Sequence, residues 1–327
     1  MPGEYDVLVT GGAGFIGSHL CEKLVSQGKT VCVLDDLSTG HLANIEALLP
    51  RKDFLFVEDS VLNPDAVNRC VHGSKTVIHL AAAVGVENVI RKPVETIETN
   101  VSGTENVLRA AKDRGTKVLI ASTSEVYGKS WQVPFKEDGD IVLGATSRNR
   151  WSYACSKALD EFLALAYNHS RGLPVVICRF FNTVGPRQSG RYGMVLPRFI
   201  NQALTEQPIT VYGNGTQTRC FSLVHEVIDC ALALMESPEA VGRVVNIGST
   251  EEITILELAR RVREISGSSS EIVKIPYEEA YPADFEDMQR RVPDVSRLVS
   301  LTGIRPTAPI EEVIRQVIEA GIPEGAQ

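Results

Sequence analysis

The sequence has no long run of hydrophobic residues, no recognisable set of metal ligands and no excess of basic charge. None of its apolar stretches approaches the roughly 20 residues of a membrane-spanning helix, so we expect no membrane segment. The six histidines have no H-E-x-x-H or other ligand spacing, so we expect no metal site. The formal net charge of −8 argues against a general nucleic-acid binder.

The cysteines exclude a further class of protein. There are seven, an odd number, and none belongs to a C-x-x-C pair. Scattered cysteines of this kind indicate reduced thiols rather than a disulfide framework, and they predict a cytoplasmic protein. A strand is expected from about Tyr5, which leaves no room for a signal peptide before it.

Short apolar runs alternate with amphipathic stretches through the first half of the chain. The runs predicted as buried strands are Asp6–Thr10, Thr30–Leu34, Phe54–Val57, Thr76–Leu80, Lys117–Ala121 and Val175–Arg179. The stretches predicted as helices are Phe15–Gln27, Pro64–Cys70, Pro93–Arg114, Trp151–Arg171, Leu196–Thr205, Val224–Glu236, Ile255–Ser266 and Ile310–Ala320. Strands separated by helices predict an α/β fold with a Rossmann-type, doubly wound parallel sheet.

The second half differs in character, because it opens with a polar loop at 186–192 that contains glycine and proline. We expect residues 1–180 to form an NAD-binding Rossmann domain, with a return segment near 220–248. Residues 181–327 are expected to form mainly a smaller α/β lobe that binds substrate. No flexible linker separates the two, so we expect the lobes to be packed together.

The first strand leads directly into a glycine-rich loop, Gly11–Gly17 (GGAGFIG), which includes Phe15 and Ile16. Gly11, Gly14 and Gly17 have the spacing that lets backbone approach a pyrophosphate at a helix N-terminus. Asp35 ends the next strand, where an acid accepts hydrogen bonds from an unmodified ribose and repels a 2′-phosphate, so NAD is favoured over NADP. Other candidates for cofactor contact at strand ends are Asp59, Leu80, Ala81 and Ala82.

The stretch from Ser122 to Lys157 carries the residues with the most chemical potential. Tyr153 and Lys157 are four residues apart on a predicted helix and share one face. A lysine cation beside a phenol favours the ionised form, so we expect a lowered pKa for Tyr153 and a role as general base. Thr123, Ser124 and Glu125 at the end of a strand supply two hydroxyls and a carboxylate.

With these residues in view, the chain resembles the extended short-chain dehydrogenase/reductase family that modifies nucleotide sugars. It is most similar to UDP-glucuronate decarboxylases and also similar to UDP-glucose 4-epimerases. Two features depart from the decarboxylases: the epimerase-like YACSK at 153–157, and AAVG at 82–85 in place of their usual Ser-Pro. The motifs that carry the resemblance are GGAGFIG at 11–17, DDLSTGH at 35–41, HLAA at 79–82, STSEVYG at 122–128, YACSK at 153–157, RFFNTVGPRQ at 179–188, VYGNGTQTRCF at 211–221, NIGSTEEITILELA at 246–259 and RRVPD at 290–294.

The resemblance implies roles for individual residues. Tyr153 would accept the proton of the sugar 4-hydroxyl, Lys157 would hold the nicotinamide ribose of NAD, and Thr123 or Ser124 would hydrogen-bond the 4-oxygen. Arg219 and Arg291 would hold the diphosphate of a UDP-sugar, with Arg219 also a candidate proton donor or carboxylate anchor. The remaining implied substrate contacts are Asn182, Val211 and Tyr212. The helices near 93–114 and 151–171 would form a four-helix interface in a homodimer.

Three reactions can follow from a 4-keto sugar. The leading prediction is decarboxylation of UDP-glucuronate to UDP-xylose, because decarboxylases and dehydratases of the family carry a glutamate at the position of Glu125. A 4-epimerase that acts on a UDP-hexose or UDP-hexuronate is the first alternative, and a nucleotide-sugar 4,6-dehydratase is the next. A non-catalytic NAD-binding sensor is a possibility of a different class, against which the intact Tyr153 and Lys157 pair argues.

Overall fold

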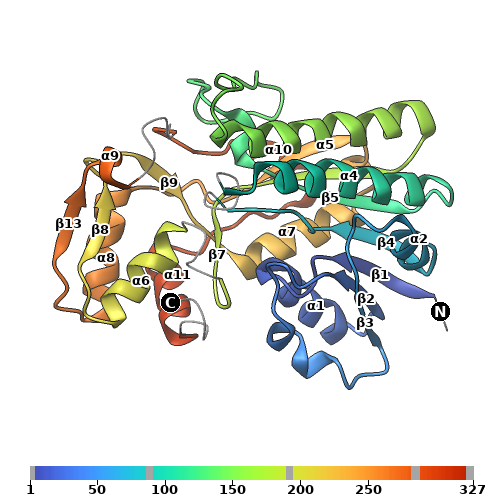
Figure 1. Cartoon of the computed structure of the whole chain (residues 1–327), viewed down its shortest axis with the longest axis horizontal. Helices are drawn as coiled ribbons and strands as arrows, with labels where there is room; N and C mark the ends of the chain where they lie inside the picture. The colour runs from blue at the N-terminus through green and yellow to red at the C-terminus, as the bar shows by residue number, and fades with distance from the viewer. Residues whose placement is uncertain (1–3, 86–90, 189–193, 281–287, 322–327) are drawn as a thin grey trace.

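A seven-stranded parallel sheet organises the larger lobe of the computed structural model, which describes residues 4–85, 91–188, 194–280 and 288–321 (Figure 1). The strand order is β11-β6-β5-β4-β1-β2-β3. Successive strands run outward in opposite directions from β1 and β4, so the crevice that binds dinucleotides in such sheets is expected at their carboxyl ends. The strands are β1 (Tyr5–Thr10), β2 (Val31–Asp35), β3 (Phe54–Glu58), β4 (Ser74–His79), β5 (Lys117–Thr123), β6 (Val175–Phe180) and β11 (Arg243–Ile247).

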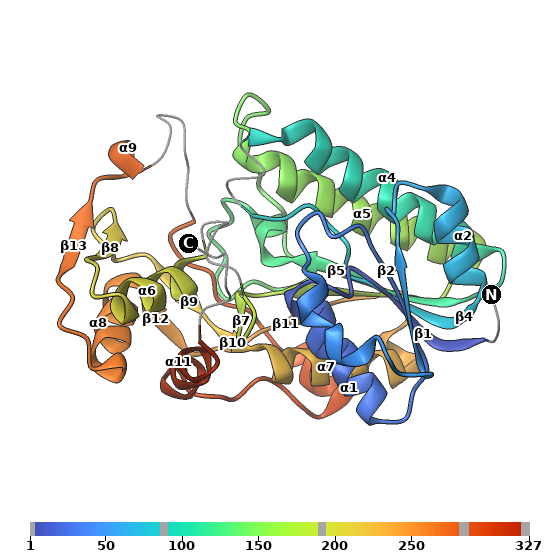
Figure 2. The same cartoon turned by 60° about the horizontal axis from the view of Figure 1, so that its bottom comes forward.

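Helices cover both faces of this sheet, as Figures 1 and 2 show. One face packs a core of buried apolar side chains against the helices α2 (Pro64–His72), α4 (Pro93–Lys112) and α5 (Arg150–Arg171). The other face packs against α1 (Phe15–Ser26), α7 (Val224–Glu236) and α10 (Ser296–Thr302). Because the strands are buried on both sides, they read as continuous apolar runs, as parallel strands do.

The smaller lobe has its own apolar core beside the carboxyl ends of the strands (Figure 2). Its helix α8 (Ile255–Ser266) is capped at the start by Thr254, whose side chain accepts a hydrogen bond from the amide of Glu257, and at the end by the left-handed Gly267. These are ordinary helix start and stop signals. The remaining elements are β7 (Thr183–Val184), α6 (Val195–Leu204), β8 (Ile209–Tyr212), β9 (Thr218–Cys220), β10 (Ser222–Leu223), β12 (Glu252–Thr254), α8 (Ile255–Ser266), β13 (Ile272–Ile275), α9 (Tyr277–Ala280) and α11 (Ile310–Glu319).

The predicted parallel, doubly wound sheet is confirmed, and most predicted elements match to within a few residues. The strand β11 and the helix α10 were not predicted. β11 has only five residues and carries a buried asparagine, Asn246, so its sequence is not a clean apolar run. The boundary between 1–180 and 181–327 stays a prediction, and residues 189–192 of the polar loop lie outside the described residues. Among the described residues, no helix is both long and apolar enough to cross a membrane.

Candidate functional site

The glycine-rich loop has the geometry of a dinucleotide cradle. Gly11 has φ +72°, and a Cβ there would lie 2.8 Å from the backbone nitrogen of Ala81. A Cβ at Gly17 would lie 2.1 Å from the carbonyl oxygen of Gly11, so glycine is required at both places. α1 begins at Gly14 with no side-chain cap, which leaves its first backbone N–H groups available to phosphate oxygens. These residues fit NAD.

Asp35 and Asp59, the two predicted acids at strand ends, sit in different surroundings. Asp35 is buried beside the glycine loop and accepts hydrogen bonds from the amides of Ala13 (2.9 Å) and Leu37 (2.8 Å). Burial raises the pKa of Asp35, although the two amides partly oppose this. Asp59 instead accepts from the amide of Ser60 at 2.8 Å in its own loop. Asp35 therefore contacts the glycine loop, whereas Asp59 stabilises the loop that follows β3.

The segment Leu80–Ala82 lies against the same cradle. The amide of Leu80 donates to the carbonyl oxygen of Thr10 at 3.1 Å, and that of Ala81 donates to the Thr10 hydroxyl at 3.3 Å. His79, just before, is fully buried with its ring nitrogens on the hydroxyls of Thr10 (2.7 Å) and Thr104 (3.1 Å). Burial lowers the pKa of His79 to about 3, so it is a neutral core histidine.

Tyr153 and Lys157 share a face of α5, but the expected effect of the lysine on the phenol is wrong for this structure. Burial and the charge of Glu125 raise the pKa of Tyr153, while a hydrogen bond with Thr123 lowers it in part. The Lys157 ammonium donates to Asp160 Oδ2 at 2.7 Å, and the charge of Asp160 is a further cause that raises the pKa of Tyr153. The phenol and the Thr123 hydroxyl are neighbours, as predicted.

Glu125 lies on the short 3₁₀ segment η3 (Ser124–Tyr127) and is held by two arginines. Its carboxylate pairs with Arg150 at 2.7 Å and with Arg291 at 2.5 Å, and all three side chains are buried or nearly so. Burial alone would raise the pKa of Glu125, but the charges of Arg150, Arg291 and Arg219 outweigh it and lower the pKa to about 2. Glu125 is therefore a carboxylate throughout the physiological range.

The arginines around Glu125 leave an excess of positive charge. Three guanidinium groups and one carboxylate sum to +2 in a region from which water is largely excluded. Arg219 is oriented by the carbonyl oxygen of Met288 at 2.8 Å, and Asn182 bridges Arg291 (3.4 Å) to the carbonyl oxygen of Cys220 (2.8 Å). Such a cluster suits an anionic ligand such as a carboxylate or a diphosphate.

Ser124 adds an open polar group to this site. The residue is 1% exposed, and its buried hydroxyl makes no hydrogen bond to any described residue. A buried hydroxyl without a partner is costly unless something binds there, so Ser124 fits a contact to a polar ligand atom.

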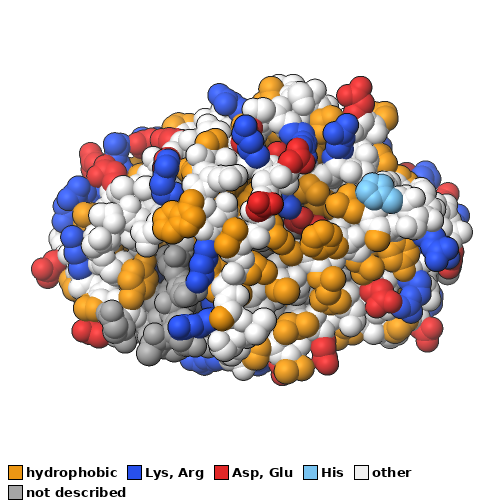
Figure 3. Space-filling model, turned by 90° about the horizontal axis from the view of Figure 1, so that it is seen from above, with side chains coloured by type: hydrophobic (Ala, Val, Ile, Leu, Met, Phe, Trp, Pro, Cys, Tyr) orange, Lys and Arg blue, Asp and Glu red, His pale blue; other side chains and the backbone are white. Residues whose placement is uncertain are grey.

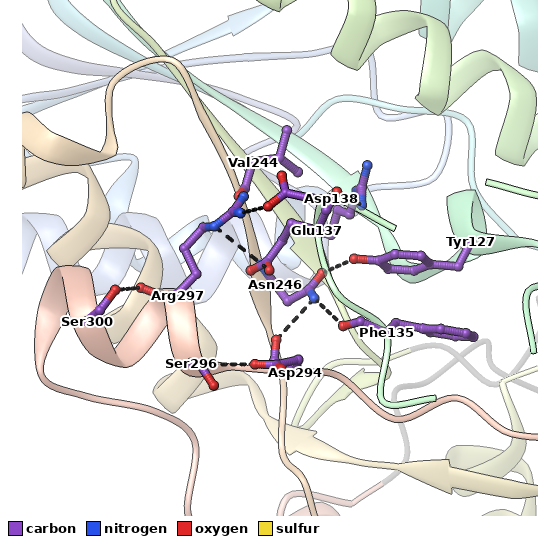
Figure 4. Close-up of polar contacts among 11 residues, drawn as sticks. Tyr127, Phe135, Glu137, Asp138, Val244, Asn246, Asp294, Ser296, Arg297 and Ser300 are labelled. Atoms are coloured by element: carbon purple, nitrogen blue, oxygen red, sulfur yellow. Dashed lines mark hydrogen bonds and ion pairs between the residues drawn. The ribbon is translucent and has the colours of Figure 1, made fainter. Parts of the chain in front are cut away.

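A buried network of hydrogen bonds centred on Asn246 lies next in sequence to both Glu125 and Arg291 (Figure 4). Asn246 at the end of β11 accepts a hydrogen bond from the Tyr127 hydroxyl (2.7 Å) and donates to the carbonyl oxygen of Phe135 (2.9 Å). Tyr127 ends the segment that carries Glu125. The amide of Phe135 donates to the carbonyl oxygen of Val292 at 2.8 Å, next to Arg291.

Sequence reasoning missed Arg150 and Asn246. Arg150 lies one helical turn before Tyr153, so its spacing on α5 could have indicated that it faces the same site. Asn246 had one local signal, a polar residue inside an apolar strand, but its partners are distant in sequence.

Val211 and Tyr212 lie on β8 in the smaller lobe. Val211 is fully buried in that lobe's core, and the guanidinium of Arg198 lies 3.9 Å above the centre of the Tyr212 ring. Their contact with uracil stays a prediction.

Comparison with known proteins gives one consistent result. A model of the family described as GDP-mannose 4,6 dehydratase matches residues 8–317. The chain is 43% identical to a UDP-N-acetyl-alpha-D-glucosaminuronate decarboxylase of Bacillus cytotoxicus, over 95% of this chain and 96% of that one. It is 36% identical to UDP-glucuronic acid decarboxylase 1 of Danio rerio, over 96% of this chain and 72% of that one. The structure of a UDP-glucuronic acid 4-epimerase from Bacillus cereus, in complex with UDP-glucuronic acid and NAD, is similar with a TM-score of 0.86 and 29% identity, and the match covers 96% of this chain and 98% of that one.

Proposed function

From the premise that this chain belongs to the GDP-mannose 4,6 dehydratase family of extended short-chain dehydrogenases, we propose that it converts UDP-glucuronate to UDP-xylose and carbon dioxide. It is an enzyme that uses NAD and acts on UDP-sugars through a 4-keto sugar. The observation that carries the choice of reaction is the ionised Glu125 between Arg150 and Arg291.

The charge state of Glu125 distinguishes decarboxylation from dehydration. Dehydration needs a base that removes the proton from carbon 5, and a carboxylate with a pKa of about 2 is a poor base for a carbon acid. Decarboxylation needs no base there, because the C5–C6 bond breaks and its electrons pass into the adjacent ketone. It does need a site for a carboxylate, which the surplus arginine charge supplies. The geometry therefore favours loss of carbon dioxide.

In the first step, Tyr153 takes the proton of the 4-hydroxyl while Thr123, within hydrogen-bond reach of the phenol, orients the 4-oxygen. The cradle of Gly11, Gly14 and Gly17 with Asp35 would hold NAD. When bound, NAD supplies a cationic ring that accepts a hydride from carbon 4 and later returns it. The positive charge of bound NAD would favour the tyrosinate and oppose the effects of burial and of Glu125 on Tyr153.

In the second step, the arginines hold the substrate carboxylate until it leaves as carbon dioxide. The electron pair then rests on the 4-oxygen as an enolate, which Thr123 and the protonated Tyr153 stabilise by hydrogen bonds. Carbon 5 takes up one proton, for which Arg219 is the candidate donor, and reduction of the ketone completes UDP-xylose. The reaction consumes one proton and leaves the cofactor unchanged.

Two alternatives have specific support. The relative that is 43% identical is a decarboxylase of UDP-N-acetylglucosaminuronate, which differs from UDP-glucuronate at carbon 2, away from the reacting atoms. The structural neighbour from Bacillus cereus is a 4-epimerase in complex with UDP-glucuronic acid, and the YACSK motif at 153–157 favours that reaction. Both alternative reactions begin with the same oxidation at carbon 4.

A product assay separates these possibilities. The full-length protein is incubated with UDP-glucuronate or with its 2-acetamido analogue, and the products are analysed by mass spectrometry and chromatography. We expect loss of the mass of carbon dioxide and recovery of UDP-xylose from UDP-glucuronate. An isobaric product that elutes as UDP-galacturonate would establish the epimerase instead. Turnover of the 2-acetamido sugar alone would show that this sugar, and not UDP-glucuronate, is the substrate. No turnover of any UDP-sugar would leave only an NAD-binding role.

We also propose a cytoplasmic homodimer that forms through α4 and α5. The two helices pack against each other, and Val94 and Ile97 on α4 and Leu159 and Phe162 on α5 are exposed. Hydrophobic side chains gather over part of the face that carries these helices (Figure 3). Phe162 is 65% exposed, so Phe162→Asp should convert a dimer into a monomer in sedimentation analysis. A monomeric wild-type protein would overturn this assembly.

A further inference from the structure

Asp160 forms a buried ion pair with the lysine of the site. The Lys157 ammonium and the Asp160 carboxylate oxygen are 2.7 Å apart, and their side chains are 3% and 0% exposed. The residues are three positions apart, so both lie on the inward face of α5. A buried pair of this kind adds little stability compared with well-packed apolar side chains. Stability alone therefore does not account for a charged residue at this position.

The pair lies close to the reversal point of the sheet. Lys157 is near enough to His79, at the end of β4, for its charge to act on that ring. His79 in turn bonds the Thr10 hydroxyl, and Thr10 is the last residue of β1 before the glycine loop. The ammonium is thus placed beside the ends of β1 and β4, where dinucleotides bind in such sheets.

An ammonium group has three N–H donors, and Asp160 takes one of them. The remaining two are then set in direction by the geometry of the first bond. We propose that Asp160 is a positioning residue that fixes the Lys157 ammonium at the NAD crevice and sets the negative field at Tyr153. The inference rests on the proposed function only for its kinetic readout, because NAD binding can be measured without any sugar.

The charged and polar groups around this pair come from every neighbouring element. His79 on β4 and Thr104 on α4 face Lys157 and Asp160, and the charge of the neighbouring Glu161 on α5 also acts on Asp160. Thr123 on β5, Glu125 on η3 and Arg291 face Tyr153, and of these only Glu125 adds negative charge. Asp160 is the other acid that raises the pKa of Tyr153. Neutralising Asp160 therefore makes the tyrosinate easier to form.

The test compares Asp160→Asn with a matched variant on the same helix. Asp160→Asn keeps the shape and an acceptor oxygen but removes the charge. We expect roughly tenfold weaker binding of NAD to the full chain by calorimetry, because a charge-assisted hydrogen bond is lost. The rate of NADH formation with UDP-glucuronate should rise with pH as Tyr153 loses its proton, and we call this rise the pH limb. In Asp160→Asn we expect the pH limb to lie about one pH unit lower, since a buried negative charge near the phenol is removed.

Glu161→Gln is the control, because it also neutralises a buried acid on α5. Glu161 pairs with Arg179 at 2.7 Å rather than with Lys157, so this variant should leave NAD affinity and the pH limb unchanged even if it is less stable. Unchanged values in Asp160→Asn, or equal changes in Glu161→Gln, would overturn the proposal.

If Asp160→Asn does not fold, Asp160→Glu decides: it should keep the wild-type pH limb while it weakens NAD binding, and unaltered NAD binding would refute the positioning role. If no UDP-sugar is turned over, the proposed function fails, but the NAD titration still tests Asp160.

Discussion

The two halves of the candidate site are assembled in different ways. Tyr153, Lys157 and Asp160 lie on one helix, α5, and this helix is anchored on the cofactor side by a bond from Asn100 to Ser156 at 3.0 Å. Glu125 depends instead on distant parts of the chain, because its partner Arg291 is 166 residues away. The first half is thus fixed by local helix geometry, and the second by tertiary packing. We expect the first half to govern oxidation at carbon 4 and the second to govern loss of carbon dioxide.

Removal of the Tyr153 hydroxyl should have the largest effect. Tyr153→Phe removes the general base, and such groups contribute about 10²- to 10⁴-fold to rate. Formation of NADH on addition of UDP-glucuronate should fall by about that factor, and release of carbon dioxide should fall with it. Rapid-mixing absorbance and trapping of labelled carbon dioxide measure the two steps. Tyr167→Phe, near the other end of α5, should leave both unchanged, and normal NADH formation in Tyr153→Phe would contradict the division of roles.

Neutralising Glu125 should separate the two halves. Glu125→Gln leaves Arg150 and Arg291 without their carboxylate, so we expect release of carbon dioxide to slow by about 10²-fold. NADH formation should not slow, because loss of the Glu125 charge makes Tyr153 easier to ionise, so NADH should accumulate in a single turnover. Glu252→Gln is the control, because Glu252 pairs with Arg290, next to Arg291, at 2.8 Å but partly in solvent. Equal slowing of both steps in Glu125→Gln would show that the site is one unit.

The placement of Tyr153 and Lys157 on one helix and most of the fold could be predicted from the sequence, because both follow from local spacing. Tyr153 and Lys157 are visible as an i, i+4 pair, and the glycine loop as a spacing of three residues. The partners of Glu125 were assigned differently, since Arg291 was expected on the diphosphate, and the diphosphate roles of Arg291 and Arg219 stay predictions. A guanidinium serves a carboxylate or a phosphate equally well, so sequence alone does not choose between them. The pKa of Tyr153 was predicted in the wrong direction because burial and the charge of Glu125 come from tertiary structure, as does the contact that holds Lys157 on Asp160.

The two halves also predict opposite responses to acid. The pKa of Glu125 is lowered to about 2 in the folded protein, so its stabilising contribution is complete above the unfolded value near 4.5 and is lost as pH falls toward 2. The contribution is on the order of 3 kcal/mol. Burial raises the pKa of Asp160, so its contribution is greatest at low pH and is lost as pH rises through the folded value. In urea unfolding, the free-energy difference between wild type and Glu125→Gln should therefore shrink from pH 6 to pH 3. A constant difference would show that Glu125 is not ionised by its arginines.

The smallest effect should come from the hydroxyl of Tyr127, and it tests whether tertiary packing sets the second half. Tyr127→Phe deletes the donor to Asn246 at 2.7 Å but keeps the ring, which stacks on Phe135 with 4.5 Å between centres. An unpaired buried acceptor costs about 1–3 kcal/mol, which should appear in the free energy of unfolding. Because Tyr127 ends the segment that carries Glu125, carbon dioxide release should slow several-fold while NADH formation stays normal. Tyr5→Phe, which removes the same atom at the start of β1, should change neither step. If Tyr127→Phe lowers stability and leaves both steps intact, the network in Figure 4 supports the fold but does not position Glu125.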